Sequence, residues 1–273
     1  MEIQKIDKDY FFRCDLYKPF GDNTINGLKI LQAEKIITNN IDDIKSKYNN
    51  TVVVHTSVHG VTGTIMAAVC NKYNIKCIIA MGGTNVNSIA KHKNLHIAHN
   101  YQADFVTLAK HGMFSALKFR INKMCNEKSF FNGCFTSNYS DIMDSLIDYN
   151  TPELPNAVDN IIIPIGSGIS FSCIYKYIIQ SNIQYKNIIG CCVGPNRIKD
   201  IIKYLGDTNY DYSNIKLYEV NKELNSAYSR RIFNSNEHIE FDSIYESKMW
   251  KWSINNDISK EINMYFVVGN NNF

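Results

Sequence analysis

From residue 51 onward, short runs of β-branched and apolar residues alternate with segments in which apolar residues recur at helical spacing. Such alternation is typical of an α/β protein whose strands run parallel. The apolar runs predict strands at 51–55, 76–81, 95–99, 130–135, 160–165, 187–193, 215–220 and 264–268. The segments between them predict helices at 61–73, 107–125, 170–181 and 197–205.

The segment 148–156, DYNTPELPN, interrupts this pattern, because it holds two of the five prolines and shows no periodicity. Such a segment is typical of a crossing between domains. We therefore expect a large domain formed by 1–47 together with 151–273, and a small inserted α/β domain formed by 48–150.

Composition and charge narrow the function classes. The net charge of +3 comes without a long basic block, so nucleic-acid binding is unsupported rather than excluded. No apolar run approaches the roughly 20 residues that span a bilayer, so we expect no membrane partner. The eight cysteines show neither CxxC nor Cys/His ligand spacing, which predicts no metal site.

The first residues lack the pattern of a signal peptide, which favours a reducing, cytoplasmic location. Asn-rich stretches such as the last five residues, GNNNF, fit a coding bias and need no function.

The sequence GSGIS, residues 166–170, follows the apolar strand IIIPI and precedes a predicted helix. A helix N-terminus offers unpaired N–H groups and a positive dipole end, and glycines let a phosphate approach the backbone closely. The loop therefore suits a phosphate, although a tight strand-to-helix turn would look the same.

The sequence TSVHG, residues 56–60, also lies between a predicted strand and a predicted helix. Hydroxyls and an imidazole at a helix start suit an anion such as a substrate carboxylate. The alternative is an ordinary capped helix, in which Ser57 or Thr62 is the N-cap and His59 is a surface residue.

Together with the N-terminal segment and DSIYESK at 242–248, these loops resemble the fold-type-II pyridoxal phosphate enzymes. Within that group the chain is similar to the family of 1-aminocyclopropane-1-carboxylate deaminase and D-cysteine desulfhydrase. The motifs fall in the family's order: Arg13, Asp15 and Leu16; Asn26, Gly27 and Lys29; Ser57 and His59; the glycine loop; and Asp242, Tyr245, Glu246 and Lys248.

The resemblance implies a two-domain fold like the tryptophan synthase β chain, with parallel sheets flanked by helices, a pyridoxal 5'-phosphate cofactor and a homodimer. By resemblance, Lys29 forms the Schiff base, Glu246 meets the pyridine nitrogen, and Tyr245 lies beside the reacting carbon, with Tyr228 as a second pocket tyrosine. The implied phosphate-binding residues are Gly166, Ser167, Gly168, Ile169 and Ser170. The implied substrate-binding residues are Thr56, Ser57, His59 and Gly60.

The chain departs from the family pattern at three motifs, one of which is the phosphate loop, where GSGIS replaces the family's Gly-Thr-rich form. Leu28, not asparagine, precedes Lys29, so Lys35 and Lys18 are alternative lysines, although neither follows a glycine at a predicted helix start. Val58 stands where the family has an asparagine that helps to hold the substrate carboxylate.

The sequence therefore predicts a pyridoxal-phosphate-dependent lyase or deaminase that acts on a small amino acid. One alternative is decarboxylation or elimination on an unusual amine, for example a modified-nucleobase amine. Another is a relative that binds a phosphate ligand without catalysis. The presence of Lys29, Tyr245 and Glu246 together argues against this last alternative, because a non-catalytic protein does not need all three.

Overall fold

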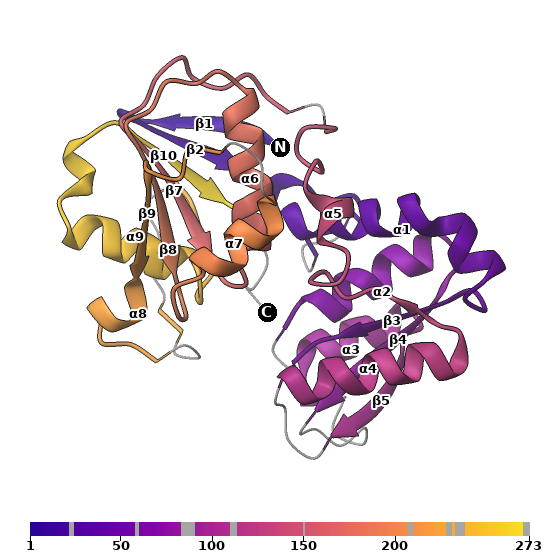
Figure 1. The fold of residues 1–273 in the computed structure, drawn as a ribbon. Helices are drawn as coiled ribbons and strands as arrows, with labels where there is room; N and C mark the ends of the chain where they lie inside the picture. Colours follow the sequence, from indigo (N-terminus) through magenta and orange to yellow (C-terminus); the bar gives the residue numbers. More distant parts are fainter. Residues whose placement is uncertain are drawn as a thin grey trace. The chain divides into compact units, whose positions relative to one another are not determined.

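The computed structural model describes residues 1–21, 25–57, 60–82, 91–109, 114–149, 151–206, 210–227, 231–232 and 238–269. The chain forms two compact units, each built on its own sheet (Figure 1). The first unit comprises Met1–Pro19, Asn26–Leu28 and Met143–Asn272. The second unit comprises Phe20–Ile25 and Lys29–Ile142.

This division differs from the expected boundaries after residues 47 and 150. Helix α1 (Leu28–Ser46), expected in the large domain, belongs from Lys29 onward to the second unit. Its contacts explain the difference. Glu34 of α1 pairs with Lys72 at 2.7 Å, and Asn40 donates to Asp141 at 3.0 Å, and both partners lie in the second unit.

The sheet of the first unit has the order β1-β2-β10-β7-β8-β9. Its strands are β1 (Glu2–Ile6), β2 (Asp9–Arg13), β7 (Asn160–Ile165), β8 (Asn187–Cys192), β9 (Ile215–Glu219) and β10 (Asn263–Val267). Every pairing is parallel except that of β1 with β2. The helical segments are η1 (Cys14–Leu16), α6 (Ile169–Gln180), α7 (Ile198–Leu205), α8 (Val220–Glu223), α9 (Glu246–Asn255) and η3 (Ile258–Lys260). The parallel sheet predicted from the apolar runs is thus confirmed.

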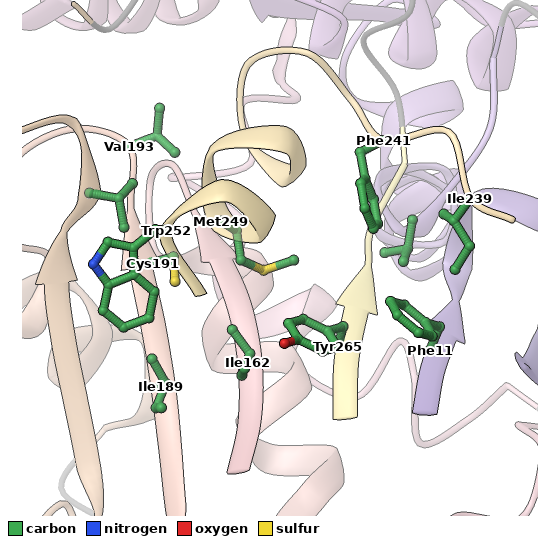
Figure 2. Close-up of a cluster of buried hydrophobic side chains, with 12 residues drawn as sticks. Phe11, Ile162, Ile189, Cys191, Val193, Ile239, Phe241, Met249, Trp252 and Tyr265 are labelled. Atoms are coloured by element: carbon green, nitrogen blue, oxygen red, sulfur yellow. The ribbon is translucent and has the colours of Figure 1, made fainter. Parts of the chain in front are cut away.

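Both faces of this sheet are covered, so every residue of the central strands β7 and β10 is buried, and most of these residues are apolar. On one face, Phe11 stacks on Tyr265 at 5.2 Å between ring centroids, beside Met249 and Trp252 of α9 (Figure 2). On the other face, Phe12 stacks on Phe266 at 4.9 Å and meets the ring edge of Tyr177 from α6. Successive residues of one strand therefore point to opposite layers, as the two-residue period of a strand requires.

The sheet of the second unit has the order β5-β4-β3-β6, and all its pairings are parallel. Its strands are β3 (Thr51–His55), β4 (Lys76–Gly82), β5 (Asp104–Ala109) and β6 (Phe131–Asn132). Besides α1, its helices are α2 (Thr62–Lys72), α3 (Lys93–Asn100), α4 (Phe114–Lys128) and α5 (Tyr139–Ile142).

The sequence prediction is wrong at one element of the second unit. Residues 95–99, predicted as a strand, lie in α3, where Leu95 and Ala98 are buried at the i, i+3 spacing of a helix face. The actual strand, β5, begins at Asp104 and overlaps the predicted helix at 107–125. An apolar run of five residues does not by itself distinguish a strand from a helix turn.

Candidate functional site

The parallel strands of the first unit's sheet have their carboxyl ends along one edge of the sheet. Because β10, β7, β8 and β9 run in the same direction, the segments that follow them share this edge. In open α/β sheets ligands bind outside the carboxyl ends of the strands. The glycine loop, the start of α7 and Val268–Gly269 all follow strands at this edge.

The glycine loop, residues 166–170, joins β7 to α6. Gly168 is the N-cap of α6 and has φ +92, a value that residues with a side chain rarely adopt. Its carbonyl accepts from the Ser172 N–H at 2.9 Å and lies 3.0 Å from the Ser172 hydroxyl. The Gly166 carbonyl accepts from Nε of Arg197 at 3.2 Å. These hydrogen bonds hold the loop at the start of α6, where the N–H groups of a helix start suit an anion.

The ring of Tyr245 lies against the first glycine of this loop. A methyl group built on Gly166 would come within 3.0 Å of Cε1 and 3.4 Å of the phenolic oxygen of Tyr245. Asp242 fixes the chain here, because its Oδ1 accepts from the N–H groups of Ile244 at 2.9 Å and Tyr245 at 2.6 Å. The structure thus brings two of the predicted site residues, Gly166 and Tyr245, into contact.

Glu246 opens α9 and is only 1% exposed. Its Oε2 accepts from the Asp242 N–H at 3.0 Å, and its Oε1 accepts from the Gly269 N–H at 2.8 Å. Burial, and then the negative charge of Asp242, raise the pKa of Glu246 to about 8, although the two N–H groups oppose the shift. A carboxyl group with this pKa exchanges its proton near neutral pH.

The N-terminal segment brings a charged pair and the start of α1 to the same part of the first unit. Nε and Nη2 of Arg13 form a two-point ion pair with Asp15, at 2.8 and 2.6 Å. The Gly27 N–H donates to the Tyr17 carbonyl at 3.0 Å, and the Leu28 N–H donates to the Val268 carbonyl at 3.1 Å. These bonds fix the backbone of Gly27 and Leu28, directly before Lys29 in the chain.

The TSVHG loop lies in the second unit, between β3 and α2. Thr56 is buried, and its hydroxyl lies 3.1 Å from the Gly60 carbonyl and 3.2 Å from the Ser57 carbonyl. The Gly60 N–H donates to the Ser57 carbonyl at 2.9 Å. Thr56 thus stabilises the loop itself, whereas Ser57 is exposed.

Two predicted site residues, His59 and Tyr228, lie outside the described residues, as does Val58. The residue before Tyr228 is described: the Ala227 carbonyl accepts from Nζ of the buried Lys248 at 2.9 Å. This bond gives the lysine of the DSIYESK motif a structural role.

Sequence reasoning did not identify Arg197 or Gly269 as residues of this site. Arg197 ends the loop after β8, and no local motif distinguishes it from other arginines at a helix start. Gly269 is the second residue after β10, and its place near a strand end is the only signal that the sequence offers.

The described residues hold neither a metal-binding cluster of side chains nor a helix that could span a membrane. No group of three or more His, Cys, Asp or Glu side chains in these ranges is arranged to hold a metal ion. None of the helices in the same ranges combines the length and apolar character needed to cross a bilayer.

No protein-family model and no curated protein matches the chain in sequence, but many solved structures share its fold. A protein described as an "ACC deaminase homologue" is 16% identical with a TM-score of 0.65, over 95% of this chain and 83% of its own. O-ureido-L-serine synthase is 13% identical with a TM-score of 0.60, over 99% and 88%. A "pyridoxal 5'-phosphate-dependent aspartate racemase" is 12% identical with a TM-score of 0.59, over 97% and 84%. The predicted fold, that of the fold-type-II enzymes, is confirmed.

Proposed function

We propose that this chain is a pyridoxal-phosphate-dependent enzyme that acts as a lyase or deaminase on a small amino acid, with the cofactor attached covalently to Lys29. The observation that carries the proposal is the contact between Tyr245 and Gly166, which joins an acid–base side chain to an anion-binding loop. The similar structures support it, since their names include a deaminase, a synthase and a racemase of amino acids.

The residues of the first unit fit this cofactor. A Cβ atom at Gly166 would crowd Tyr245, so glycine at this position lets the tyrosine ring lie against the start of the loop. The loop Gly166–Ser170 would hold the phosphate group at the start of α6. Glu246 would meet the ring nitrogen, because each carboxylate oxygen that accepts one backbone N–H retains a second lone pair.

When bound, pyridoxal phosphate supplies an electron sink for the carbon that carries the substrate amino group. The chain's own residues must then move protons. In the proposal, the Nζ amine of Lys29 takes or returns the proton on that carbon, and the phenol of Tyr245 acts as a second acid or base. The raised pKa of Glu246 suits a group that shares a proton with a ring nitrogen.

The substrate's acidic group is assigned to residues 56–60 of the second unit. Ser57 is exposed at a turn that the buried Thr56 stabilises, so its hydroxyl is available on a fixed backbone. The N–H groups that begin α2 add donors for an anion. A homodimer remains part of the proposal and rests on the sequence resemblance alone.

The test is reduction of the purified protein with borohydride after incubation with pyridoxal phosphate, followed by peptide mapping. We expect the label on Lys29 and its loss in Lys29→Ala. Lys35→Ala is the matched control, because Lys35 lies on the same helix and should keep the label on Lys29. A label on Lys35, or no label at all, would contradict the proposal.

A further inference from the structure

One peptide group connects Glu246 to the start of α1. The bond between Val268 and Gly269 lies just after β10, and both of its polar atoms are used. Its N–H, on Gly269, donates to Oε1 of Glu246 at 2.8 Å. Its carbonyl, on Val268, accepts from the Leu28 N–H at 3.1 Å. Glu246 is thus linked through a single peptide plane to the residue that precedes Lys29.

This link requires two segments of backbone to approach closely, and a glycine stands on each side. Gly27 has φ +96, and a Cβ atom there would overlap the Val268 carbonyl oxygen. Gly269 has φ +84, and its Cβ would lie 3.1 Å from the Gly27 Cα and 3.0 Å from the Asp15 Cα. Any side chain at either position would push the peptide group away from α1, because the atoms it meets include backbone that cannot rotate aside.

We infer that Gly27 and Gly269 are positioning residues for Lys29, and that Glu246 holds the peptide group through which they act. The inference rests on the proposed function, since Lys29 is the reactive amine only if that proposal holds. The inference gives a structural role to Gly269, the first residue of GNNNF, a stretch for which the composition of the chain indicates no function.

The physical basis is the geometry of a helix start. The first N–H groups of a helix lack partners within it, so an outside acceptor decides where the first turn lies. For Leu28 that acceptor is the Val268 carbonyl. Hydrogen bonds in a chain also polarise one another, so the bond from Gly269 to Glu246 strengthens the one that Leu28 donates. Lys29 directly follows Leu28, and its backbone position is therefore set by this chain of bonds.

The test compares Gly269→Ala with Gly206→Ala. Gly206 also lies in the first unit and has φ +74, but nothing lies within 4 Å of a Cβ atom built there. Both variants therefore place alanine at a positive φ, and only Gly269→Ala adds the crowding. Two quantities are measured: hydrogen exchange at the Leu28 amide in protein without cofactor, and the rate of borohydride-trapped labelling of Lys29 by pyridoxal phosphate.

We expect faster exchange at Leu28 and labelling slowed by about tenfold to a hundredfold in Gly269→Ala, the effect of misplacing a reactive group by about 1 Å. Gly206→Ala should match the wild-type protein in both. Labelling of Gly269→Ala at the wild-type rate, or an equal slowing in Gly206→Ala, would overturn the inference.

If Gly269→Ala does not fold, Glu246→Asp replaces it, because the shorter side chain keeps the carboxyl group but cannot reach both N–H groups. Faster exchange at Leu28 in that variant would support the link, and unchanged exchange would refute it. Failure of the proposed function would look different: the wild-type protein itself would carry no label on Lys29, while the exchange measurement would still report on the link.

Discussion

The ring of Tyr245 rests on the backbone of Gly166, with Cε1 placed 3.0 Å from where a methyl group on that glycine would lie. The two residues come from elements that are distant in the chain, the end of β7 and the turn before α9. Asp242 accepts from the backbone N–H groups of Ile244 and Tyr245, and Arg197 donates to the Gly166 carbonyl. The pair is therefore fixed by neighbours that do not depend on any ligand.

Gly166→Ala should separate this pair. The added methyl group meets an aromatic ring, so either the ring or the loop must move, at a cost of about 1–3 kcal/mol in the free energy of unfolding. Urea unfolding measures this cost, and the affinity for pyridoxal phosphate should fall with it. Ser167→Ala, at an exposed position of the same loop, should change the free energy of unfolding by less than about 0.5 kcal/mol. Equal stabilities of Gly166→Ala and the wild-type protein would show that the contact has no energetic weight.

The features that the sequence predicts correctly are those with local causes. A strand buried on both faces must be apolar throughout, so IIIPI at 161–165 predicts β7, and the glycines that follow predict the turn into α6. The same signal misleads at Leu95 and Ala98, because a short apolar run fits one face of a helix equally well.

The features that escape prediction depend on residues far apart in the chain. Gly269 must be glycine because Asp15 and Gly27 approach it, and nothing in its own neighbourhood indicates this. Likewise, the motif around Tyr245 predicts a site by resemblance, but the glycine that the ring contacts follows a different strand. Such contacts are set by tertiary packing, which residue patterns describe only indirectly.

Glu246 should make the stability of the cofactor-free protein depend on pH. Its pKa of about 8 in the folded state lies above its ordinary value of 4.5. Between these values the folded state holds a proton that the unfolded state has released. The contribution of this proton to the free energy of unfolding is therefore fully present below the unfolded-state pKa of 4.5. It is lost as pH rises through the folded-state pKa of about 8, by up to about 1.4 kcal/mol per pH unit. Urea unfolding across this window measures the slope.

Glu246→Gln should flatten that slope, because the amide does not titrate. The groups that act on Glu246, namely Asp242, Asp15 and Arg13, remain in the variant, so the difference from the wild-type protein isolates the carboxyl group. Glu127→Gln makes the same chemical change on the exposed surface of α4 and should leave the slope unaltered. A wild-type slope that persists in Glu246→Gln would mean that another group titrates in this window.

Ser57→Ala tests which part of the substrate residues 56–60 bind. If the Ser57 hydroxyl donates to the substrate's acidic group, its removal should raise the apparent dissociation constants of small amino acids by roughly tenfold, the effect of losing a charge-assisted hydrogen bond of about 1.5 kcal/mol. Titration of the cofactor-loaded protein, followed by its absorption spectrum, measures these constants.

The matched control for Ser57→Ala is a change of ligand. An amine with the same side chain but no carboxylate should bind the variant and the wild-type protein equally, because it makes no bond to Ser57. Thr56 should not be replaced in this experiment, since its buried hydroxyl contacts the carbonyls of Ser57 and Gly60, and its loss would move the loop itself. If amino acids leave the spectrum unchanged while larger amines without a carboxylate shift it, the loop does not bind a carboxylate. The substrate would then be a larger amine without a carboxylate, and the proposed lyase or deaminase reaction on an amino acid would be wrong.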